Sequence, residues 1–145
     1  MIALLQRVTA ARVEVEGRDI ASIGAGLLVL VGVERQDSES AADRLAERLV
    51  AYRIFADEAD RMNLSVREVG GSVLLVPQFT LAADTSGGLR PSFSAAAPPA
   101  RAAELFERLA AGVRASGVRL ECGRFGAHMR VTLTNDGPVT FRLEA

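Results

Sequence analysis

The stretch from Leu27 to Val33 reads LLVLVGV, an unbroken apolar run rich in β-branched residues. Such a run is typical of a strand that is buried on both faces. A second buried strand, SVLLV, is predicted at 72–76. Between the two, 38–55 is predicted to be a helix, because its apolar residues recur on one helical face. The stripe consists of Leu45, Leu49 and Tyr52.

Further strands are predicted on both sides of this centre. Near the N-terminus they cover 2–8, 12–16 and 18–23, and the second of these alternates strictly. A second helix is predicted to open at Pro98 or Pro99 and to be capped by Gly117. Its apolar stripe is Leu105, Phe106, Leu109 and Val113.

Three strands are predicted to close the chain, at 118–122, 127–134 and 139–143, with residues 135–138 as the turn between the last two. This order of elements predicts an α/β fold of mixed or stacked β-sheets, with two helices packed on one side.

The chain has 145 residues, which is enough for one domain, so residues 1–145 are predicted to form a single domain. Its 49% hydrophobic and 24% charged residues exclude collagen-like and disordered classes. No apolar run approaches the 18 or so residues of a membrane-spanning helix. The first residues lack the basic and long apolar regions of a secretion signal, so a cytoplasmic protein is expected.

The charge balance is 17 basic against 18 acidic residues, which argues against bulk coating of nucleic acid. Every basic residue is an arginine, and the absence of lysine is interpreted as a result of genome composition and not of function. The single Cys122 and single His128 exclude an intramolecular disulfide, a cysteine-rich zinc site and a multi-histidine metal site. No metal or cofactor is therefore expected.

Familiar catalytic patterns are absent. A lysine-containing phosphate loop is impossible without lysine, and Gly24-Ala25-Gly26 precedes a strand where a dinucleotide fingerprint would follow one. A Cys122–His128 nucleophilic pair is formally possible. Cys122 is interpreted instead as a small packing residue, and His128 as a solvent-facing residue on a strand whose other face carries Met129.

Two segments contain residues that an ordinary strand or turn does not require. In the segment 76–81, VPQFTL, Pro77 marks the exit of a buried strand and leaves Gln78 and Thr80 as polar groups at its end. In 135–140, NDGPVT, a hairpin signal is followed by Pro138, and a bond before proline can be cis. The alternative for each segment is a plain turn.

Taken together, the two segments resemble the D-aminoacyl-tRNA deacylases. The stretch AADT at 82–85, RPSF at 90–93, the first eight residues, GLLVLVGV at 26–33 and YRIF at 52–55 also resemble that family. The similarity runs in matching order over essentially the whole chain. It implies a three-layer, deacylase-type fold.

The resemblance also implies a homodimeric enzyme that hydrolyses the ester between a D-amino acid and the 3′-terminal adenosine of tRNA, and that clears mischarged glycine. It implies a cis bond between Gly137 and Pro138, whose carbonyls reach into the partner subunit's pocket and hold the substrate ammonium. Catalysis is assigned to the segment Gln78, Phe79 and Thr80. The residues implied to brace or line the pocket are Arg7, Phe125 and Met129.

One position departs from the family, which usually has serine where this chain has Pro77. Proline lacks both the hydroxyl and the backbone N–H. The resemblance implies no protein nucleophile. The hydrogen-bond donors are expected to lie at Phe79 and Thr80, so activity is expected to survive. The alternatives are a tRNA-end binding module that Pro77 has disabled, or a structural dimerisation domain without an RNA partner.

Overall fold

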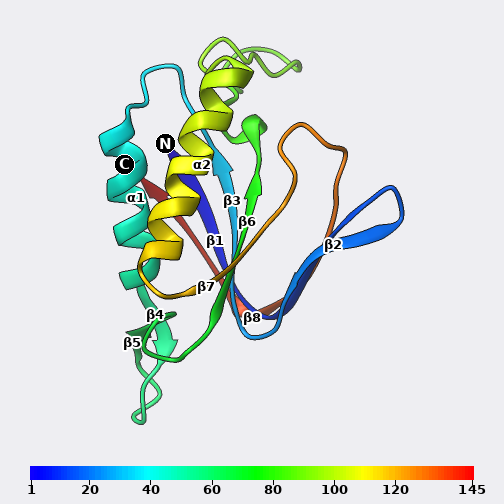
Figure 1. The fold of residues 1–145 in the computed structure, drawn as a ribbon. Helices are drawn as coiled ribbons and strands as arrows, with labels where there is room; N and C mark the ends of the chain where they lie inside the picture. Colours follow the sequence, from blue (N-terminus) through cyan, green and yellow to red (C-terminus); the bar gives the residue numbers. More distant parts are fainter.

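The computed structural model describes residues 1–145. Two helices lie side by side on one face of a mixed sheet (Figure 1), which confirms the predicted α/β fold. No helix has the length and apolar character to cross a membrane. The elements in chain order are β1 (Ile2–Val15), β2 (Arg18–Ile23), β3 (Gly26–Gly32), α1 (Glu39–Ala51), β4 (Arg53–Ala56), β5 (Met62–Ser65), β6 (Ser72–Pro77), the 3₁₀ helix η1 (Phe79–Ala82), α2 (Pro99–Ala115), β7 (Arg119–Cys122) and β8 (Arg130–Glu144).

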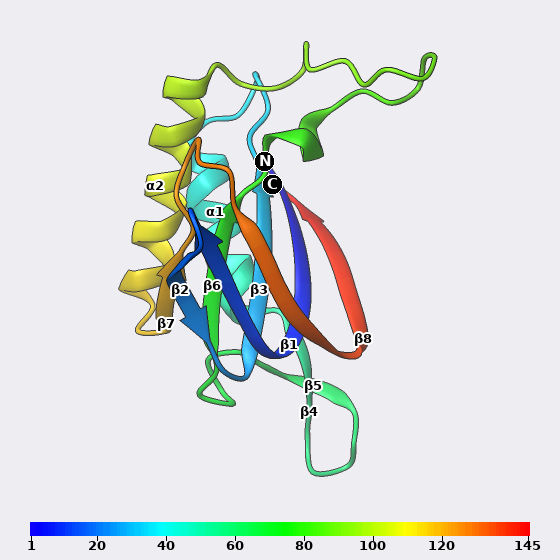
Figure 2. The ribbon, with the colours of Figure 1, turned by 90° about the vertical axis from the view of Figure 1, so that its right-hand side faces the viewer.

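The long strand β1 organises the sheet. Its first half pairs with β3 and its second half with β2, while β8 runs antiparallel along its other edge (Figure 2). Beyond β3 the sheet continues in parallel through β6 to β7. The order is thus β2-β1-β3-β6-β7, with β8 as a further partner of β1.

Strands β3 and β6 are buried on both faces, as their unbroken apolar sequences predict. On the helical side, Leu27, Val29 and Val31 belong to a core of 26 buried residues. On the other side, Leu28 and Leu74 belong to a second core of eight, which β1 and β2 also supply. The sheet therefore curls over itself, and the molecule has three layers.

Both helices follow their predicted stripes. The α2 residues Leu105, Phe106, Leu109 and Val113 are all buried. Helix α1 starts where the Ser38 hydroxyl accepts a hydrogen bond from the N–H of Ala41 at 3.3 Å. Past the end of α2, Gly117 adopts a φ of 82°.

Three predicted boundaries are wrong, and the strand predicted to start at 127 starts at Arg130. Helix α1 ends at Ala51, because the chain turns there into the short hairpin β4–β5, which its weak sequence pattern did not predict. The segments 2–8 and 12–16 form the single strand β1. Likewise 135–138 is not a hairpin turn, since both halves of β8 pair with the same strand, β1, and the chain keeps its direction.

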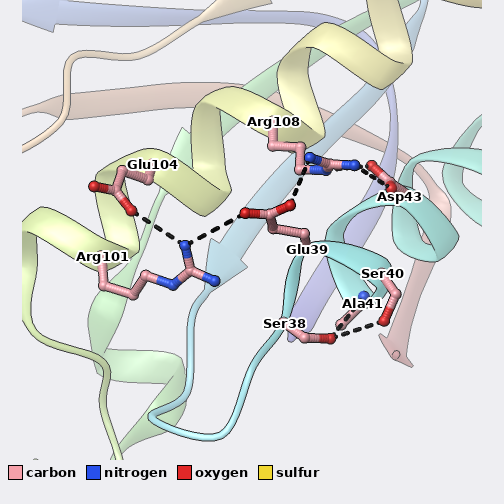
Figure 3. Close-up of polar contacts among 8 residues, drawn as sticks. All are labelled: Ser38, Glu39, Ser40, Ala41, Asp43, Arg101, Glu104 and Arg108. Atoms are coloured by element: carbon pink, nitrogen blue, oxygen red, sulfur yellow. Dashed lines mark hydrogen bonds and ion pairs between the residues drawn. The ribbon is translucent and has the colours of Figure 1, made fainter.

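Ion pairs join the two helices at their exposed faces (Figure 3). The Arg108 guanidinium donates to both carboxylate oxygens of Asp43 at 2.7 Å and to Glu39 at 2.9 Å. Arg101 lies 3.1 Å from Glu104 and 3.9 Å from Glu39. These hydrogen bonds from Arg108 lower the pKa of Asp43 from its ordinary value of 3.8.

We predict that Arg108→Gln lowers the melting temperature more at pH 7 than at pH 3. A carboxylate whose pKa is lowered on folding adds stability above its unfolded value, and this stability is lost as pH falls through the folded value. Thermal melts at both pH values check this, with Arg44→Gln as an exposed, unpaired control on α1. An equal loss at pH 7 and pH 3 would contradict the assignment.

Candidate functional site

A cavity of about 490 Å³ opens where the parallel strands β3 and β6 end. Its walls come from the carboxyl ends of these strands, the first turns of α2 and the loop between β7 and β8. Eleven of its 16 lining residues are hydrophobic, and none is acidic. Ligands bind preferentially at the carboxyl ends of strands in sheets of this kind, so this cavity is the candidate site.

The segment after β6 forms part of the cavity wall. Strand β6 ends at Pro77 as predicted, and the N–H of Gln78 donates to the carbonyl of Val31 at 2.7 Å. Phe79 then begins η1, and the Gln78 side chain donates to the hydroxyl of Thr80. The N–H groups of Phe79 and Thr80 open this helical turn, so they have no carbonyl acceptor within it.

The loop after β7 supplies the facing wall. Phe125 and Met129 both line the cavity, and the Phe125 ring lies 6.4 Å from the ring of Phe106 on α2. A Cβ added at Gly123 would come within 2.9 Å of the Met129 sulfur. Glycine at this position therefore allows Met129 to approach the end of β6.

The second predicted segment forms a bulge within β8. Residues 136–139 stand opposite the single residue Arg7 of β1, and the Gly137–Pro138 bond is cis. Arg7 donates to the carbonyl of Asp136 at 3.0 Å and to that of Ile54 at 2.8 Å. Gly137 and Pro138 themselves are exposed.

Asn135 ties the two ends of this bulge together. Its side-chain oxygen accepts from the N–H of Val139 at 2.9 Å, and its amide donates to the Thr140 hydroxyl at 2.9 Å. Gln6 of β1 donates to the same hydroxyl at 3.3 Å. Hydrogen bonds from Arg7, Gln6 and Asn135 therefore hold this exposed bulge, which is called the Gly137–Pro138 turn below.

The predicted site residues thus fall into two groups within one chain. Gln78, Phe79, Phe125 and Met129 line the cavity, with Thr80 beside them, whereas Arg7, Gly137 and Pro138 do not. The strand register separates the groups by three strand spacings and about four residues, roughly 20 Å. No single chain brings all eight together.

The sequence did not predict the contribution of α2 to the cavity. Ala102 and Phe106 line it, although their positions in the apolar stripe indicated only core packing. His128 also lines it, so its interpretation as a solvent-facing strand residue is incomplete: it is exposed, but it lies before β8 begins. An apolar stripe alone does not distinguish a core from the wall of a pocket.

Cys122 does not act with His128. The thiol lies outside the cavity lining and contacts Arg114 at 3.9 Å, and burial raises its pKa, which disfavours the thiolate. No group of three or more His, Cys, Asp or Glu side chains is placed to hold a metal ion. The cavity therefore offers backbone groups, the Gln78 amide and the His128 imidazole for chemistry.

The family model described as D-Tyr-tRNA(Tyr) deacylase matches residues 4–144. The chain belongs to this deacylase family. A D-aminoacyl-tRNA deacylase of Nitrosococcus oceani is 60% identical over 99% of this chain and 93% of its own length. Another, of Alkalilimnicola ehrlichii, is 60% identical over 100% of this chain and 97% of its own length. As a member of this family of deacylases, the chain is a hydrolase.

Solved structures agree with the deacylase fold. One described as "c-Myc DNA Unwinding Element Binding Protein" is 35% identical with a TM-score of 0.94, and the match covers 100% of this chain and 99% of that one. A probable eukaryotic D-amino acid tRNA deacylase has a TM-score of 0.86 at 18% identity, covering 99% and 98%. At 18% identity, the similarity to this second structure supports the fold and says nothing about activity.

We predict that Ala102→Leu lowers deacylase kcat/KM by about tenfold or more, roughly 1.4 kcal/mol. The larger side chain would fill the cavity from the wall that α2 provides. Kinetics on an aminoacyl-tRNA and a thermal melt check this, with Ala100→Leu as the exposed control outside the cavity lining. Unchanged kcat/KM in a folded Ala102→Leu variant would mean that the substrate lies elsewhere.

Proposed function

We propose that the protein hydrolyses the ester that joins a D-amino acid, or mischarged glycine, to the 3′-terminal adenosine of tRNA. The observation that carries this proposal is the position of Gln78, Phe79 and Thr80 at an apolar cavity in a chain of the deacylase family. The substrate implies a cytoplasmic enzyme that acts beside translation. Residues 1–145 would act as one domain.

The complete site would lie between two copies of the chain. The cavity and the braced Gly137–Pro138 turn are roughly 20 Å apart in one chain, and the turn is exposed. A homodimer would allow the turn of the partner subunit to enter the cavity. This arrangement would bring all the predicted site residues together.

In that site the carbonyl oxygens of Gly137 and Pro138 would accept hydrogen bonds from the substrate ammonium. Once the ammonium and the ester are both held, the side chain of an L-amino acid must point into the backbone of the turn. Arg7 and Asn135 brace the turn, so it cannot yield. The L-ester would be rejected by steric conflict, whereas glycine has no side chain to reject.

The chemistry would need no protein nucleophile. Water would attack the ester carbonyl, the bond to the ribose 3′-oxygen would break, and that oxygen would leave as a hydroxyl after taking a proton, with the neighbouring 2′-hydroxyl assisting. The N–H groups of Phe79 and Thr80, which open η1, would stabilise the developing oxyanion. Cys122, the strongest nucleophile in the chain, lies outside the cavity lining.

A catalytically disabled tRNA-end binding module is the second candidate. Pro77 lines the cavity and offers neither a hydroxyl nor an N–H there. If those groups were required, the protein would bind aminoacyl-tRNA without releasing its amino acid. Turnover under excess substrate distinguishes the two candidates, because a binding module gives a stoichiometric plateau.

The decisive experiment compares D-Tyr-tRNA and L-Tyr-tRNA with the purified protein under the same conditions. Our proposal expects many turnovers on the D-ester and little loss of the L-ester. Equal hydrolysis of both esters would contradict the proposed steric rejection of the L-ester. Hydrolysis of neither would favour the binding module and make Pro77 the explanation.

We predict that Gly137→Ala lowers kcat/KM for the D-ester by about a hundredfold, roughly 2.7 kcal/mol. An added Cβ would lie 2.5 Å from Cγ2 of Val139, at a φ of 144° that disfavours side chains, so the turn would change shape. Gly17→Ala is the matched control, with a φ of 75° and nothing within 4 Å. Similar losses in both variants would show that the carbonyl positions do not matter.

We predict that Pro77→Ser changes kcat/KM by less than about tenfold, because the proposed oxyanion donors belong to Phe79 and Thr80. Steady-state kinetics on D-Tyr-tRNA measure this directly. A larger gain would mean that the groups restored by serine take part in the reaction.

A further inference from the structure

The loop between β7 and β8 carries cationic and hydrogen-bond-donating groups at the mouth of the cavity. His128 is the one titratable residue among the cavity-lining side chains, and Arg124 precedes the lining residue Phe125. Both side chains are exposed and take part in no ion pair. Residues 123–130 contain no carboxylate.

The geometry of this loop is fixed. The N–H of Ala127 donates to the carbonyl of Arg124 at 3.2 Å, which closes a turn. The Phe125 ring packs against Phe106 of α2, and the N–H of Gly123 donates to the carbonyl of Leu75 at 2.7 Å, which anchors the start of the loop to β6. The backbone of Arg124 is therefore held next to the lining residue Phe125, and His128 itself lines the cavity.

The proposed substrate places phosphate at the mouth of the cavity. Its ester is on the ribose of the last nucleotide, and the 5′-phosphate of that nucleotide is attached to the same sugar. When the ester lies beside Gln78 and Phe79, the phosphates of the unpaired 3′ strand must pass the mouth of the cavity. An apolar cavity without acidic residues does not repel them.

We propose that Arg124 and His128 bind the phosphates of the unpaired 3′ strand of tRNA. This inference rests on the proposed function. The guanidinium fork of Arg124 matches a phosphate with two parallel hydrogen bonds. The imidazole of His128 has an N–H donor whether or not it is charged. Such contacts set the register of the strand and do not read its bases.

The test measures equilibrium binding of uncharged tRNA to Arg124→Gln, His128→Gln and the double variant. The double variant is expected to raise Kd about tenfold or more. The slope of log Kd against log salt should fall by about 0.7 for each phosphate that the variant no longer binds. Arg119→Gln is the matched control, because Arg119 is exposed at the other end of β7.

A second substrate localises the effect. Transfer RNA trimmed of its unpaired 3′ nucleotides should bind the wild-type protein and the double variant alike. Wild-type affinity of the double variant for intact tRNA would overturn the inference, as would an equal weakening for trimmed tRNA. Deacylation of D-Tyr-tRNA by the wild-type protein, measured separately, reports on the proposed function and not on these two residues.

Discussion

The parallel ladder between β3 and β6 is the interaction on which the rest of the structure depends. It begins where Gly26 passes Ser72 so closely that an added Cβ would lie 1.9 Å from the Ser72 carbonyl oxygen. It ends where Pro77, which has no N–H to donate, releases the chain from the sheet. Both helices pack on one side of this ladder and the curled sheet on the other. The cavity opens where the ladder ends.

Most of this fold could be predicted from the sequence, because burial on two faces demands unbroken apolar runs. Strand β2 and the start of α2 lie where the pattern placed them. The β4–β5 hairpin could not be predicted, since strands of four residues are too short to show a clear apolar pattern. The continuity of β8 through Gly137–Pro138 depends on pairing with β1, a long-range contact that no local turn signal contains.

The candidate site was also predictable only in part, because local sequence patterns do not show which residues meet across the fold. Pro77 marks a strand end, so the polar groups after it could be located from the sequence alone. The wall formed by Ala102 and Phe106 could not, because a residue that faces a pocket and a residue that faces a core have the same periodicity. His128 was misjudged because strand alternation was extended through a loop that precedes β8.

The distance between the cavity and the Gly137–Pro138 turn has a genetic consequence. Suppose that two copies of the chain share each site, and that a mixed dimer contains one copy mutated in the cavity and one mutated in the turn. Both mutations then affect the same site. The second site then combines an intact cavity with an intact turn. Two alleles that are each inactive alone would restore partial activity when they are expressed together, so complementation between alleles would reveal how the sites are shared.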